Sequence, residues 1–86
     1  MPPTRLTERD LQIGHNLRRI RLFRDLSQQA VSGRMRIRGW SQSTLSRVEA
    51  GERSLTVGEL LDLCDLYEVD PTVAWSERLA VTEAVR

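Results

Sequence analysis

The sequence predicts a single all-α domain built from four to five short helices. Two observations support this fold class: apolar residues recur at helical spacing in several segments, and each segment follows a residue suited to capping a helix. The 86 residues can enclose one small hydrophobic core, with little room for a deep catalytic cavity. We expect a disordered arm at 1–6, a helical domain at 7–75 and a helical C-terminal segment at 76–86.

The first helix is predicted to begin after Thr7, because Glu8 and Asp10 place negative charge at the positive end of the helix dipole. Apolar side chains then follow near helical spacing at Leu11, Ile13, Leu17 and Ile20. The helix is expected to end within 23–25, and Leu26 is expected to pack behind it as a buried plug.

Ser27 can cap a second helix. Its apolar positions are Ala30, Val31 and Met35. Gly33 weakens this helix and leaves its far end undefined. The following segment, 33–40, alternates arginines with other residues. Read with a period of two it could form a short strand, but its position between two helices favours a loop.

The segment 41–51 predicts a short third helix with a polar, exposed face. Ser41 is a good N-cap, and Gly51 suits the left-handed residue that follows a helix end. The apolar positions form a narrow inward stripe of Leu45, Val48 and Ala50. The side chains left pointing outward are Gln42, Ser43, Ser46 and Arg47. Because glutamine and arginine can make two-point contacts with adenine and guanine edges, this face indicates a helix that inserts into a partner.

Thr56 is predicted to cap a fourth helix, and Asp70 with Pro71 to begin a fifth. The apolar stripe of the fourth helix is expected to consist of Val57, Leu60, Leu61, Cys64 and Tyr67. Its outward acids, which form either a solvated face or a docking surface, are Glu59, Asp62, Asp65 and Glu68. The fifth helix has apolar positions at Val73, Ala74, Trp75, Leu79 and Val81. These apolar residues favour a dimer contact, or else they cap the core of the monomer.

The charges of the chain are strongly segregated, although the net charge is only +1. Residues 1–53 hold eleven arginines and five acids, a net charge of +6. Residues 54–86 hold two arginines and seven acids, a net charge of −5. A positive face on an otherwise balanced molecule indicates a polyanionic partner such as nucleic acid.

The composition excludes several classes of function. The single cysteine, Cys64, rules out an internal disulfide and a multi-cysteine zinc site, and on an apolar stripe it acts as a small hydrophobe. His15 lacks partners at metal-ligand spacing, and no histidine–acid pair is placed to activate a serine. No apolar run approaches the ~20 residues of a membrane span, and the N-terminus lacks a signal-peptide stretch. We therefore expect a cytoplasmic protein that is not an enzyme and takes no cofactor, metal or small-molecule ligand.

Two runs of the sequence together resemble a known DNA-binding motif. They are LSQQAV at 26–31 and GWSQSTLSRVEAG at 39–51. These runs are similar to the helix-turn-helix of the Cro/cI-type (XRE-like) repressors, whose pattern reads L-S-Q-x-x-L-A and then G-(V/I)-S-x-(S/P)-x-(I/L)-S-x-(I/W)-E-x-G. The resemblance extends from about Leu11 to Trp75 and implies a lambda-repressor-like fold.

The resemblance implies roles for individual residues. The helix at 41–50 resembles the recognition helix, which enters the major groove. Base contacts are implied for Gln42, Ser43, Ser46 and Arg47. Backbone contacts are expected from Ser27, Gln28, Thr44, Arg18, Arg21, Arg53, Arg34, Arg36 and Arg38. Gln28 also resembles a residue that braces the recognition glutamine, and Arg21 and Glu49 match positions that form a structural ion pair.

The sequence departs from the family pattern at two places. The connector between the second and third helices is longer by about three residues, around Arg36 and Arg38, than the usual helix-turn-helix connector. The arginines of this insertion either lie beside phosphates or belong to a solvated loop that raises the local potential. Trp40 stands where a smaller aliphatic residue is usual, and we expect it to fill the core rather than stack on a base.

The function implied by the resemblance is a sequence-specific regulator of transcription that binds double-stranded DNA. The simplest form is a repressor, such as a phage or mobile-element immunity repressor. A homodimer would place two recognition helices about one DNA turn apart and read a palindromic operator. The alternative is an antitoxin-like or anti-regulator module that binds another protein, which the acidic fourth helix and the apolar C-terminus favour.

Overall fold

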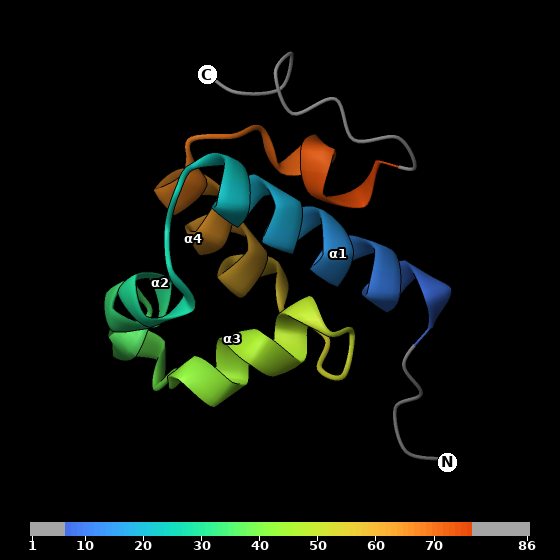
Figure 1. Cartoon of the computed structure of the whole chain (residues 1–86). Coiled ribbons are helices and arrows are strands. Elements are labelled where there is room, and N and C mark those ends of the chain that lie inside the picture. Colours follow the sequence, from blue (N-terminus) through green and yellow to red (C-terminus); the bar gives the residue numbers. More distant parts are fainter. Residues whose placement is uncertain (1–6, 77–86) are drawn as a thin grey trace.

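The computed structural model describes residues 7–76 and contains helices joined by short turns (Figure 1). The elements in chain order are α1 (Glu8–Phe23), α2 (Gln28–Arg34), the 3-10 helix η1 (Arg36–Arg38), α3 (Gln42–Glu49), α4 (Val57–Tyr67) and the 3-10 helix η2 (Pro71–Trp75). The predicted all-α fold class is therefore confirmed. The arm at 1–6 and residues 77–86 of the C-terminal segment lie outside the described residues. None of the described helices is both long and apolar enough to cross a bilayer.

Each α-helix begins at the capping residue that the sequence predicts. The hydroxyls of Thr7, Ser27, Ser41 and Thr56 each accept a hydrogen bond from a backbone N–H of the first turn. In α1, α3 and α4 the residue at the third helical position returns a bond to the cap, which completes a capping box. A cap of this kind stabilises a helix by about 1 kcal/mol, so local sequence determines where these helices start.

The core is formed where α1 packs against its neighbours. In Figure 1, α1 crosses the middle of the molecule, with η2 along one side and α3 along the other. Fully buried apolar side chains come from all four α-helices and the turn after α4, and include Leu17, Ile20, Val31, Leu45, Leu63, Cys64, Tyr67 and Val69. Asn16 of α1 is also buried, and its amide donates to the carbonyl oxygens of Ala74 at 3.0 Å and Ser76 at 2.9 Å. These bonds attach η2 to α1.

The predicted orientation of α4 is wrong at three positions. Val57 and Leu61, expected in the core, are 74% and 43% exposed, whereas Glu59, expected to face solvent, is 6% exposed. The buried stripe instead runs through Leu60, Leu63, Cys64 and Tyr67. Glu59 lies one turn before Leu63 and therefore shares its side of the helix. Helical periodicity could not predict this, because a carboxylate is buried only where other segments supply its partners.

The connector and the last helix also differ from the sequence predictions. The α2 helix continues through Gly33 to Arg34, and η1 forms a single 3-10 turn rather than a strand or an irregular loop. Gly39 follows η1 with φ 77°, a left-handed conformation that favours glycine. The predicted fifth α-helix begins at Pro71 but is a 3-10 helix, and Trp75 at its end is 41% exposed.

Candidate nucleic-acid interface

The helix α3 presents one polar face that no other described element covers. Leu45 and Val48 are buried and fix the orientation of the helix. The four side chains predicted to contact bases are all exposed: Gln42, Ser43, Ser46 and Arg47. This geometry leaves the predicted contact face free to meet an external partner.

The C-terminal end of α3 is held by a buried ion pair between Arg21 and Glu49. Arg21 Nε lies 2.6 Å from Glu49 Oε2 and Nη2 lies 3.0 Å from Oε1, so the pair is bidentate. Both side chains are more than nine-tenths buried. The bond to Glu49 raises the pKa of Arg21 above its usual value. Glu49 is therefore neutralised inside the protein and does not present its charge to a polyanion.

Two roles expected at this pair need correction. The third guanidinium nitrogen of Arg21, Nη1, donates to the carbonyl of Leu26 at 2.7 Å, so all of its nitrogens are used internally. Arg21 is thus a structural residue and not a DNA backbone contact. Gln28 donates from Nε2 to Glu49 Oε1 at 3.0 Å, so in the described residues it braces the buried acid rather than the recognition glutamine.

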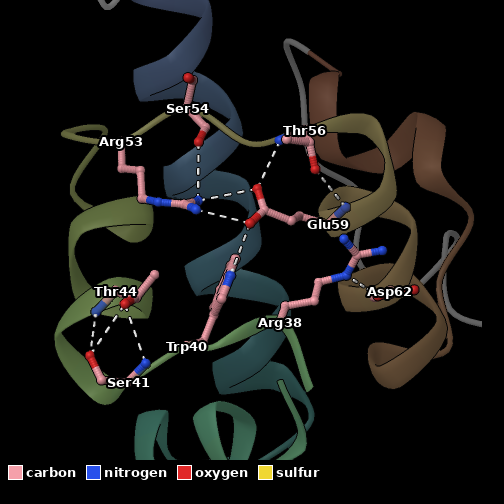
Figure 2. A network of polar contacts seen from close by, with 9 residues as sticks. All are labelled: Arg38, Trp40, Ser41, Thr44, Arg53, Ser54, Thr56, Glu59 and Asp62. Atoms are coloured by element: carbon pink, nitrogen blue, oxygen red, sulfur yellow. Dashed lines mark hydrogen bonds and ion pairs between the residues drawn. The ribbon is translucent and has the colours of Figure 1, made fainter. Parts of the chain in front are cut away.

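A second polar network holds the segment before α3 against the start of α4 (Figure 2). Trp40 is 5% exposed, and its indole N–H donates to Glu59 Oε2 at 3.0 Å. Arg53 binds the same carboxylate through two nitrogens, at 2.9 and 3.2 Å, and its guanidinium carbon lies 5.2 Å from the centroid of the Trp40 ring. Trp40 accordingly fills the core and does not offer its ring to a base.

This network also engages Arg53, whose expected contact with the DNA backbone stays a prediction. Both terminal nitrogens of Arg53 are committed to Glu59, whose side chain also accepts from the backbone N–H of Thr56 at 2.9 Å. Thr44 is similar: its hydroxyl is bonded to the backbone N–H of Ser41 at 3.2 Å, and we assign it to the capping of α3. Ser27 is exposed, and its hydroxyl caps α2.

The bonds to Glu59 make stability depend on pH in the acid range. They lower the pKa of Glu59 from 4.5 to about 2, chiefly through Arg53. A carboxyl with a depressed pKa in the folded state contributes stability above its unfolded pKa, and this contribution is lost as the pH falls through the folded value. The free energy of unfolding of the wild-type chain should fall between pH 4.5 and 2, and Glu59→Gln should make this fall smaller by on the order of 2 kcal/mol. Urea unfolding at several pH values measures the difference. Glu52→Gln, at an exposed acid, is the control; equal pH profiles for both variants would contradict the assignment.

The backbone of α1 approaches α3 closely at Gly14. A Cβ atom at this position would lie 2.2 Å from the carbonyl oxygen of Val48 and 3.1 Å from that of Glu49. Only glycine therefore allows α1 and the end of α3 to pack at this separation. The sequence does not reveal this close packing at Gly14, because a glycine within a helical pattern carries no sign of what it contacts.

The arginines predicted to contact phosphate separate into two groups. Arg38 pairs with Asp62 of α4, as Figure 2 shows, and Arg21 and Arg53 are paired as described above. Of the other arginines predicted to contact DNA, Arg18, Arg34 and Arg36 (phosphate) and Arg47 (base edges) are exposed and make no ion pair with any residue of 7–76. The free arginines belong to α1, the end of α2, η1 and α3. In this part of the chain, no three His, Cys, Asp or Glu side chains gather into a metal-binding group.

The burial of Glu59 was missed from the sequence, although a local sequence pattern could have revealed it. Thr56 and Glu59 have the spacing of a capping box, in which the acid turns back toward the helix start. Such an acid does not simply point outward. The pairing of Asp62 with Arg38 had no comparable signal, because the two residues lie 24 positions apart.

Comparisons with known proteins agree with this arrangement. A family model described as a helix-turn-helix domain matches residues 12–75. The structure is similar to that of the BldD DNA-binding domain of S. venezulae, with a TM-score of 0.70 and 31% identity over 81% of this chain and 100% of that one. The fold is also similar to that of the restriction-modification controller protein C.AhdI from Aeromonas hydrophila, with a TM-score of 0.66 and 24% identity over 77% of this chain and 96% of that one. A search of curated proteins gives no significant match.

Proposed function

The chain belongs to the family of helix-turn-helix domains, and from this premise we propose that it is a regulator of transcription that binds double-stranded DNA through α3. The observation that carries the proposal is the uncovered polar face of α3, with Gln42 and Arg47 exposed and Glu49 neutralised by Arg21. A helix with this face can enter the major groove without presenting an unpaired acid to phosphate.

Affinity and specificity come from different residues in this proposal. Gln42, Ser43, Ser46 and Arg47 read base edges, while Arg18, Arg34 and Arg36 supply salt-dependent attraction to phosphates. Ser27 and Gln28 add uncharged hydrogen bonds to the DNA backbone. The protein acts as a repressor, of the kind that phages and mobile elements use for immunity. It binds as a homodimer to a palindromic operator, with its C-terminal segment as the dimer contact, and works in the cytoplasm.

The direct test is binding of the full chain to random-sequence duplex DNA at low salt, followed by selection and sequencing of the bound DNA. A retarded complex and a selected palindrome support the proposal. If no complex forms at low salt, DNA binding is wrong, and the protein-binding alternative takes its place. The exposed apolar residues Val57 and Leu61 of α4 are the surface that favours this antitoxin-like or anti-regulator module.

Arg47→Ala should weaken binding to the selected site by about 1–3 kcal/mol and relax the preference at one base pair, because a two-point contact to one base is lost. Fluorescence anisotropy on the selected site and its single-base variants measures both effects. Arg9→Ala, an exposed arginine at the start of α1, controls for the loss of one positive charge. An equal loss of affinity on every sequence would make Arg47 a phosphate contact instead.

A further inference from the structure

Arg38 is the connector arginine that already has an acidic partner among residues 7–76. Its Nε donates to Asp62 Oδ2, which joins η1 to α4 across the surface (Figure 2). The side chains are 36% and 43% exposed, so solvent reaches both. Its neighbours Arg34 and Arg36 are exposed and make no ion pair within residues 7–76. One arginine of the three is therefore paired with an acid in the folded protein.

The structure provides space for this pair. A Cβ atom at residue 58 would lie 2.8 Å from Nη2 of Arg38, so Gly58 leaves room for the guanidinium against the first turn of α4. Asp62 follows Gly58 by one helical turn and meets the guanidinium from the same side. The first two turns of α4 thus give the Arg38 guanidinium both a space beside Gly58 and an acidic partner in Asp62.

The pair lies close in sequence to the proposed contact face. Arg38 precedes the first residue of α3, Gln42, by four positions, and the chain turns between them at Gly39. Phosphate contacts beside the groove position a protein on duplex DNA, and Arg38 lies in the segment that leads into α3. An arginine that binds phosphate releases a condensed counterion and steepens the salt dependence of binding. A carboxylate that stays beside the guanidinium offsets its charge and reduces this effect.

We propose that Asp62 masks Arg38 from the phosphates of duplex DNA. The affinity of the protein for DNA is then lower than its three connector arginines could provide. This inference rests on the proposed DNA binding and adds a residue that opposes it. A half-exposed ion pair contributes little to stability, so losing Asp62 frees the arginine without unfolding the domain. The ligand of the unmasked site is the phosphodiester backbone, independent of base sequence.

The test compares the affinities of four variants of the full chain for one random-sequence duplex between 50 and 200 mM salt, about the range over which phosphate contacts are resolved. Asp62→Asn is expected to tighten binding about fivefold at the lower salt and to steepen the slope of log K against log salt by about 0.9. Arg38→Ala alone should change the affinity less than about twofold, since a masked charge is removed. The double variant should bind like Arg38→Ala.

Asp65→Asn is the matched control, because Asp65 is an exposed acid on the same helix and makes no ion pair with a described residue. It measures the general effect of removing one negative charge. The inference is overturned if Asp62→Asn tightens binding no more than Asp65→Asn does, or if it does so equally in the Arg38→Ala background. Failure of the wild-type chain to bind any duplex is a different result, and it overturns the proposed function along with the inference.

Discussion

Glu49→Ala is expected to lower the free energy of unfolding by about 3–5 kcal/mol, the largest effect of any single change considered for this protein. The substitution leaves the buried guanidinium of Arg21 without its bidentate partner and removes the acceptor of Gln28. A small domain has a total stability of only about 5–15 kcal/mol, so this variant should be close to unfolding at room temperature. Urea denaturation followed by circular dichroism measures the loss.

Two further variants separate the effect of breaking the ion pair on the free energy of unfolding from the effect of simply removing one charge. Glu52→Ala removes an exposed acid three residues later and should change stability by less than about 0.5 kcal/mol. Replacing both partners, as Arg21→Met with Glu49→Leu, should recover most of the loss, since apolar side chains of similar size carry no buried charge. Equal effects of Glu49→Ala and Glu52→Ala would show that the pair does not hold α3.

Gly14→Ala is expected to destabilise the domain by about 3 kcal/mol, at the upper end of the range for overpacking. In an exposed helix the same change would stabilise by ~1 kcal/mol, because alanine is the better helix former. Here the added methyl group meets the carbonyl oxygen of Val48, a backbone atom that cannot rotate away. The end of α3 must then move relative to α1, so binding to DNA should weaken as well.

Gly33→Ala is the matched control, because Gly33 also lies within an α-helix and a Cβ atom there would have no neighbour within 4 Å. This variant should gain about 0.5–1 kcal/mol through helix propensity alone. Urea unfolding of the two variants should therefore give shifts of opposite sign. Stabilisation by Gly14→Ala would mean that α1 and α3 can separate without cost.

Much of the fold could be predicted from the sequence, because the signals were local. The caps at Thr7, Ser27, Ser41 and Thr56 define where the four α-helices start. The narrow apolar stripe of α3 determines which of its side chains face outward. One failure arose from a distant partner: Glu59 was assigned to solvent, although Trp40, 19 positions away, donates to its buried carboxylate.

The sequence by itself determined the helix starts, the helix-turn-helix pattern and the polar face of α3. Only the tertiary structure decided which of the described arginines have an acidic partner. Arg38 and Arg36 are equivalent in sequence, two exposed arginines of one connector, yet only the first pairs with Asp62. The physical reason is that the strength of an ion pair depends on the distance between its charges and on their exposure to solvent. For residues 24 positions apart, that distance is set only when α4 packs beside the connector.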